Sequence, residues 1–166
     1  MVAKYNLFKA CVNFKLGKFK EALTSLSLKV ELSKDKLGWE IAIRLLRIMA
    51  QIELGKLDEV QNAVVSLQKH LERNAPKGDV HERDRLILKL MQLLDREGFR
   101  KGHCTPEMSR LLLRLSETSG SMAWQPFSPE LIPIHIWMMT RFDLNPEKIV
   151  VKPKKKRKPG KSSAAA

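Results

Sequence analysis

The chain has 166 residues, a net charge of +13 and a hydrophobic content of 43%, which is enough for one compact domain or a short array of repeats. It contains no run of about 18 apolar residues, which excludes a typical membrane-spanning helix. Its two cysteines, Cys11 and Cys104, are too few for a disulfide-stabilised miniprotein, so we expect reduced thiols and a cytoplasmic protein, or a nuclear one if the source is eukaryotic.

Helical periodicity covers the first 73 residues. Apolar residues three and four positions apart predict helices at 5–16, 19–30, 39–54 and 57–71, with a polar turn at 31–36. The helix at 39–54 has the broadest apolar face. We therefore expect it to be packed on more than one side, with Trp39, Leu45, Met49 and Ile52 inside.

One phrase occurs in both pairs of helices. LGKFKEAL at 16–23 returns as LGKLDEVQ at 54–61, an offset of 38 residues. Because glycine tolerates backbone angles that other residues avoid, Gly17 and Gly55 permit two antiparallel helices to turn within few residues. We expect valine at either glycine to destabilise the fold and valine at Gly102 to matter less. A helical-hairpin repeat explains the offset, and a plain antiparallel bundle with two similar turns is the alternative.

Three further helices are predicted after a break at 74–78. One covers about 80–97 and ends at Gly98. Thr105-Pro106-Glu107 and Ser128-Pro129-Glu130 each have the cap, the proline and the acid that begin a helix. Pro133 removes one hydrogen bond early in the last helix. No segment alternates apolar and polar residues with a period of two, so the sequence predicts an all-α fold.

The two phrases and their surroundings resemble the tetratricopeptide repeat (TPR) family. The resemblance covers residues 4–73, with an offset longer than the usual period of about 34. It implies antiparallel hairpins stacked as a short right-handed solenoid, with two hairpins in residues 1–73 and a degenerate third hairpin and a capping helix in residues 74–146. The residues that carry it are Ala10, Gly17, Phe19, Ala22 and Leu26 in the first unit and Gly55, Leu57, Val60 and Val64 in the second.

The function implied by the resemblance is binding. TPR arrays hold a peptide or a partner helix in a groove, so we expect a non-catalytic protein–protein interaction module or scaffold. The positions at which one subclass grips a C-terminal carboxylate with lysine and asparagine are Leu7 and Cys11 here, so that clamp is absent. For the charged residues, a solvated outer face is the alternative to a groove. Helix phase gives the expected groove residues as Lys4, Leu7, Cys11, Arg44, Arg47 and Gln51.

The histidines do not form a catalytic or metal-binding pattern. We expect His70 on a helix surface, His81-Glu82-Arg83-Asp84 as a solvated helix start, and His135 packed in the apolar run 131–139. His103 and Cys104 are adjacent, but no second pair at zinc-ligand spacing accompanies them. We therefore expect no catalytic residues, no cofactor and no metal.

The C-terminal tail, predicted to be disordered over residues 147–166, carries more than half of the net charge. Its composition cannot form a packed core. In a nucleated cell it would resemble a nuclear import signal, and elsewhere an electrostatic arm for RNA, DNA or anionic lipid. For the tail itself, the alternative is a solvated segment without a specific partner. For the whole chain, the alternative to the interaction module is a nucleic-acid-associated function that uses the tail. The positive residues are Lys152, Lys154, Lys155, Lys156, Arg157, Lys158 and Lys161.

Overall fold

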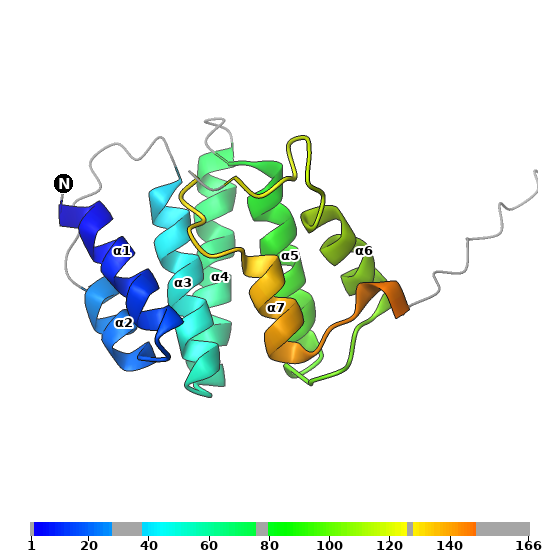
Figure 1. Ribbon diagram of the computed structural model, residues 1–166, viewed down its shortest axis with the longest axis horizontal. Helices are drawn as coiled ribbons and strands as arrows, with labels where there is room; N and C mark the ends of the chain where they lie inside the picture. The colour runs from blue at the N-terminus through cyan, green and yellow to red at the C-terminus, as the bar shows by residue number, and fades with distance from the viewer. Residues whose placement is uncertain (1, 28–37, 76–79, 126–127, 149–166) are drawn as a thin grey trace, which may run out of the picture.

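The described part of the chain, residues 2–27, 38–75, 80–125 and 128–148 of a computed structural model, is all-α and contains no strand. This confirms the predicted fold class. The predicted polar turn at 31–36 lies outside the described residues. The helices are α1 (Val2–Lys15), α2 (Phe19–Ser27), α3 (Trp39–Glu53), α4 (Leu57–Asn74), α5 (Glu82–Arg96), α6 (Pro106–Leu115) and α7 (Ile134–Phe142), followed by the short 3₁₀ helix η2 (Pro146–Lys148) (Figure 1).

The two turns that share a phrase also share a backbone geometry. Gly17 and Gly55 have φ values of 72° and 70°. After Gly17, the amide of Lys18 donates to the carbonyl of Asn13 at 2.8 Å, and the bond displaced by 38 residues is present at 3.0 Å. This glycine-centred motif satisfies the last carbonyls of a helix. The sequence offset therefore corresponds to two hairpins that turn with the same hydrogen bonds.

The prediction that Gly102 tolerates substitution better than the two repeat glycines is wrong on backbone grounds. Gly102 has φ 70°, the same left-handed conformation. Its amide also donates to the carbonyl of Phe142 at 2.7 Å, which joins the loop after α5 to the end of α7. A loop outside the repeat phrase can impose the same requirement for glycine, since only the local φ decides the strain.

Each helix packs against the next from α1 through α6. α5 ends with the same motif, because the amide of Phe99 donates to the carbonyl of Leu94 at 2.8 Å. The connection to α6 is longer than the first two turns, and α6 begins where the sequence predicts. Thr105 caps it, and its hydroxyl oxygen accepts a hydrogen bond from the amide of Met108 at 3.2 Å.

One hydrophobic core runs through all seven helices. Leu45, Met49 and Ile52 are buried, which confirms the expected burial of the α3 stripe. Trp39, at the beginning of the same helix, is only half-buried. Its ring lies beneath the ammonium group of Lys4, which is 4.9 Å from the ring centroid.

The predicted helix start at Ser128-Pro129-Glu130 is wrong. The helix begins six residues later, at Ile134, with Pro133 as its N-cap. A residue that precedes proline is disfavoured in the helical region, so Pro133 marks the boundary of the helix and not its first turn. Glu130 nevertheless contributes to the beginning of the helix, because its carboxylate accepts a hydrogen bond from the amide of Ile134 at 3.0 Å.

The last part of the chain turns back over the first part. α7 does not follow α6 as a further layer, and Figure 1 shows it in front of the row formed by the other helices. Residues 128–144, here called the crossing segment, contain α7 and its flanks. Beyond them, Glu147 and Lys148, which the sequence assigns to the tail, belong to η2. The rest of the predicted tail, residues 149–166, lies outside the described part.

Candidate functional site

The crossing segment covers the face of α1 and α3 on which Leu7 and Cys11 lie. Only a cavity of about 20 Å³ remains between the two, lined on one side by residues of α1 and α3, including Leu45 and Met49, and on the other by residues from Pro129 to Ile134. The rings of Phe14 and Trp137 meet edge to face with their centroids 6.3 Å apart. This face is therefore occupied by the chain itself.

Glu53 at the end of α3 anchors α7. Its two carboxylate oxygens accept hydrogen bonds from the indole nitrogen of Trp137 and from Nε of Arg141, each at 2.8 Å. The Glu53 side chain is 16% exposed and that of Arg141 is 29% exposed. Partial burial weakens solvent screening of this charged pair. The two contacts join residues more than eighty positions apart in the sequence.

Arg83 anchors the beginning of the crossing segment. Its guanidinium binds both oxygens of Glu130, at 2.6 Å from Nε and 2.9 Å from Nη2. Nη1 donates to the carbonyl oxygens of Leu115 and Met122. Both side chains of the ion pair are almost completely buried, at 9% and 11% exposed. A bidentate pair of this kind fixes orientation as well as distance.

His135 completes this buried cluster in its neutral form. Nη2 of Arg83 lies 3.0 Å from its Nδ1. Because a guanidinium can only donate, Nδ1 accepts and the ring proton sits on Nε2. Burial, followed by the charge of Arg83, lowers the pKa of His135, while Glu130 opposes the shift. The expectation that His135 is packed is confirmed.

Sequence reasoning missed the role of Arg83, which it placed on a solvated helix start. The helical phase of α5 nevertheless predicts that Arg83 is buried. Arg83 shares its α5 face with Ile87, Leu90 and Leu94, at intervals of three and four residues, and all are buried. An arginine on a core stripe indicates a buried partner. Glu130, 47 positions away, could not be identified from local pattern.

The six expected groove residues do not line one groove. Leu7 is 1% exposed and Gln51 is 8% exposed, so both are core positions. Cys11 faces the crossing segment. Arg44, Arg47 and Gln51 contact α2 and α4 instead. Their helical phase placed them on one side of α3, but the neighbouring helices, which the phase does not give, fill that side.

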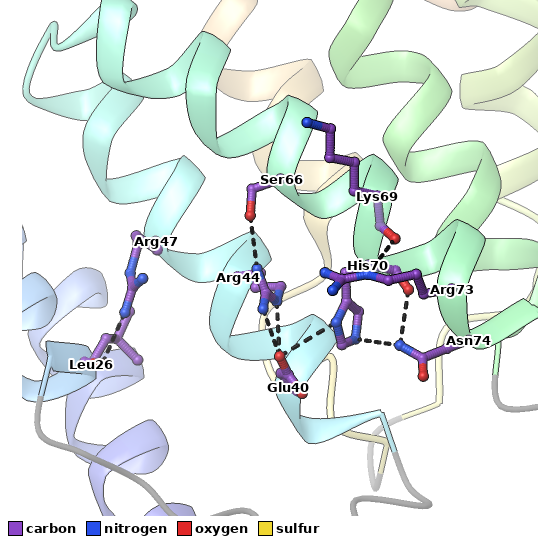
Figure 2. A network of polar contacts seen from close by, with 9 residues as sticks. All are labelled: Leu26, Glu40, Arg44, Arg47, Ser66, Lys69, His70, Arg73 and Asn74. Carbon is purple, nitrogen blue, oxygen red and sulfur yellow. Dashed lines mark hydrogen bonds and ion pairs between the residues drawn. The ribbon is translucent and has the colours of Figure 1, made fainter.

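Figure 2 shows what Arg44 and Arg47 contact. Arg44 binds Glu40 at 2.6 Å and donates to the hydroxyl of Ser66 in α4 at 3.1 Å. Arg47 donates to the carbonyl oxygen of Leu26 in α2 at 3.0 Å. These bonds tie α3 to the helix on either side of it.

The same network contains a second histidine. Nδ1 of His70 lies 3.4 Å from Glu40, and its side chain is 13% exposed. The expected surface position of His70 is therefore wrong. Its position late in α4 places it against the beginning of α3, because the two helices are antiparallel.

The described residues provide no metal-binding group of three or more suitable side chains. Cys11 and Cys104 are both unpaired thiols, as expected. Burial raises the pKa of Cys11 to about 11, with Lys15 opposing the shift, so this thiol is protonated at neutral pH. Within the described part, no helix is long and apolar enough to cross a bilayer.

An uncovered apolar surface lies on α1. Four large side chains at helical spacing, here called the apolar row, are largely exposed: Tyr5 at 66%, Phe8 at 49%, Val12 at 58% and Leu16 at 64%. They lie on the side of α1 opposite Leu7, Ala10 and Phe14, which are buried. Scattered exposed apolar residues are ordinary, but a continuous row of them is a candidate contact surface.

Lysines flank the apolar row on both sides. At 100° per residue, Lys4 and Lys15 lie along one edge and Lys9 along the other. All three are exposed, and α1 contains no acidic residue. Among the ion pairs formed by the described residues, none uses Lys9 or Lys15. The surface is apolar along its centre and positive along its edges.

No protein-family model matches the chain, and neither the curated proteins nor the solved structures contain a match. The resemblance to the TPR family therefore rests on the sequence alone.

Proposed function

We propose that the chain is a non-catalytic, TPR-like protein–protein interaction module that binds its partner through the apolar row of α1. The observation that carries this proposal is the exposure of Tyr5, Phe8, Val12 and Leu16 in one continuous row. A protein exposes such a row to water at a cost in free energy unless another surface covers it.

The occupied face of α1 and α3 supports the choice of surface. In the groove that the resemblance implies, a peptide would meet Leu7 and Cys11. Here the crossing segment lies on both residues, and it is held by Glu53 at one end and Arg83 at the other. The apolar row is on the opposite side of α1 and stays accessible while the crossing segment is in place.

A comparison of two aspartate variants tests the proposal. Val12→Asp places a charge within the apolar row, and Val65→Asp places the same charge at a valine of α4 that is 49% exposed. The full chain and both variants are expressed in the cells from which the gene comes, and their bound proteins are quantified by mass spectrometry. We expect a defined set of proteins that Val12→Asp loses and Val65→Asp keeps. Identical sets would overturn the proposal.

The basic tail supports a second candidate, a nucleic-acid-associated function in the cytoplasm or nucleus. Its seven positive residues lie within ten positions, 152–161, without an acid among them. Such a cluster binds polyanions through counterion release, and its affinity falls steeply with salt. Binding through the apolar row depends much less on salt because its central contacts are uncharged.

A further inference from the structure

We infer that the partner of the apolar row is an amphipathic helix with acidic residues along the edges of its apolar face, and that it packs on α1 as α2 packs on α3. This inference rests on the proposed function and specifies the partner. It follows from a comparison of equivalent positions in the two hairpins and from the charge of α1.

The 38-residue offset identifies what covers the equivalent row in the second hairpin. The row on α3 is buried or half-buried, and α2 packs against α3. Arg47, next to this row, donates to the carbonyl oxygen of Leu26 in α2. In α3 a preceding helix therefore covers part of the row that α1 leaves open, and Leu46 also lines the small cavity beneath the crossing segment. The equivalent pairs are Tyr5 and Ile43, Phe8 and Leu46, Val12 and Ala50, and Leu16 and Leu54.

The larger side chains of the α1 row determine the kind of helix that fits. Val12 stands where α3 has Ala50, and Phe8 where it has Leu46. A helix that packs over the bulkier α1 row must offer small residues, such as alanine, along its line of closest approach. Its contact face is therefore apolar and partly small.

The lysines that flank the apolar row determine which charge the partner helix must carry. Lys9 occupies the position of Arg47 under the same offset, and Arg47 donates to a carbonyl in the last turn of α2. Lys9 is therefore placed to meet the C-terminal carbonyls of a docked helix, where a cation is favourable. Lys4 and Lys15 meet its other edge, and an acidic edge pairs with them.

A second copy of the chain is a poor occupant of this surface. Two copies of α1 would bring lysine-lined edges together without a single acid between them. Like charges that face each other destabilise a helix pair. Charge complementarity therefore favours a different, acidic helix.

The experiment uses the full chain and two labelled synthetic peptides of about five helical turns. The first has leucine and alanine on one face and glutamates along both edges. The second has lysine in place of every glutamate. Binding is measured by fluorescence anisotropy for the unmodified chain, Val12→Asp, Lys9→Glu/Lys15→Glu, and Lys69→Glu/Lys101→Glu. The last variant has the same change of charge at exposed lysines of α4 and of the loop after α5.

We expect the glutamate peptide to bind the unmodified chain and the Lys69/Lys101 variant equally. The Lys9/Lys15 variant should bind it at least ten times more weakly and should instead bind the lysine peptide. Val12→Asp should bind neither. Circular dichroism must show the same helicity for all variants. This exchange of charge preference separates the apolar row from the basic tail, which is identical in every variant.

Three outcomes would overturn the inference. Equal binding of the glutamate peptide by all variants would place its site on the tail. A dimer in sedimentation equilibrium that Val12→Asp dissociates would make a second copy the occupant. Binding to phosphatidylcholine–phosphatidylserine vesicles that Val12→Asp abolishes, without binding of the glutamate peptide, would make it an anionic membrane surface.

Failure of the inference is distinguishable from failure of the proposed function. If Val12→Asp loses its cellular partners but the glutamate peptide does not bind, the apolar row is an interaction surface for a partner of another chemistry. If Val12→Asp keeps all its cellular partners, the proposed function itself fails.

Discussion

At the scale of single residues, Arg83 joins several separate parts of the described chain. It binds both oxygens of Glu130, two backbone carbonyls and His135 from one buried guanidinium. Removing one partner of a buried ion pair leaves the other charge without compensation, which costs several kcal/mol. Arg83 thereby fixes where the crossing segment begins.

Replacing Arg83 should destabilise the protein strongly. We expect Arg83→Met to lower the free energy of unfolding by about 3–5 kcal/mol, because it leaves the Glu130 carboxylate buried and unpaired. The control is Arg114→Met, which breaks an ion pair with Glu82 whose side chains are about half exposed. That pair should contribute less than about 1 kcal/mol. Urea unfolding measures both, and equal losses would contradict the role given to Arg83.

The neutral His135 predicts a dependence of stability on pH. Its folded-state pKa lies below its ordinary value of 6.5. Below about pH 6.5, His135 therefore binds a proton in the unfolded chain more readily than in the folded chain. Stability therefore falls as pH decreases through this range, by at most about 1.4 kcal/mol per pH unit. Asp84, whose pKa burial raises, acts in the opposite direction, because the folded chain binds its proton more readily.

His135→Asn tests this effect, because the amide oxygen can accept from Arg83 and does not titrate. We expect the variant to lose less unfolding free energy than the unmodified chain when pH falls from about 7 to 5.5. An NMR titration of the His135 ring protons should give a midpoint below 6.5. A variant with an unchanged slope would exclude His135 as the cause.

Residue roles were predictable to the extent that they depend on local phase. The burial of Leu45 and Met49 and the packing of His135 follow from spacing along one helix. The sequence predicts a groove position for Gln51 and a surface position for His70, because each lies on a polar side of its own helix. In the structure another helix covers that side, and the pattern within one helix does not predict which helices lie next to it.

At the scale of helices and turns, the repeated phrase corresponds to a repeated structure. The turns at Gly17 and Gly55 share φ values and hydrogen bonds. A Cβ atom at either glycine would meet nothing within 4 Å. The constraint at these glycines is therefore backbone conformation and not space.

Alanine in place of either glycine should therefore measure only the strain of a left-handed backbone conformation. We expect Gly17→Ala and Gly55→Ala each to lower the unfolding free energy by about 1–2 kcal/mol. Asn62→Ala, at an exposed position within α4, should have no such effect, since alanine is the better helix former. Thermal or urea unfolding provides the comparison. Neutral glycine substitutions would mean that the turns relax to another geometry.

The attachment of α7 to Glu53 can be measured as a coupling energy. In a double-mutant cycle of Glu53→Ala and Arg141→Ala we expect a coupling of about 1 kcal/mol, because the pair is partly buried. The exposed pair of Lys56 and Glu59 should give a clearly smaller coupling, because solvent screens it. Hydrogen exchange should show α7 amides losing protection in Glu53→Ala. Unchanged protection would show that Glu53 does not hold α7.

The existence of the helices was predictable, and their ends less so. The caps at Thr105 and the glycine turns are local chemistry, and the structure has them where the sequence predicts. The signal at 128–130 failed because Pro133 competes with it. Glu130 binds Arg83 and also accepts the amide hydrogen of Ile134 at the beginning of α7. The local sequence shows neither contact.

At the scale of the whole molecule, the basic tail and the helical body are expected to act independently. Deleting residues 152–166, which lie outside the described part, should leave helicity and the melting temperature nearly unchanged and should abolish binding to DNA or another polyanion. If all seven charges contacted phosphates, the slope of log affinity against log salt would be about −6. Full polyanion affinity after deletion would place the basic site on the body and would favour the nucleic-acid function.

The order of the helices from α1 to α6 was predictable, but the position of α7 was not. Its contacts with Phe14 and Glu53 depend on side chains separated by most of the chain. The sequence predicted the last helix to be a cap at the end of the row. The hydrophobic residues of α7 are equally suited to either position, and only the partners decide between them.

The return of the crossing segment has a consequence for how the protein unfolds. In an array whose units touch only their neighbours, the ends separate first and unfolding proceeds unit by unit. Here α7 ties α1 and α3 to α5 and to the loop after it, so neither end can separate without breaking contacts with the other. The described helices therefore form a closed ring of contacts rather than an open row. In such a ring, neither terminal helix is free to unfold before the others.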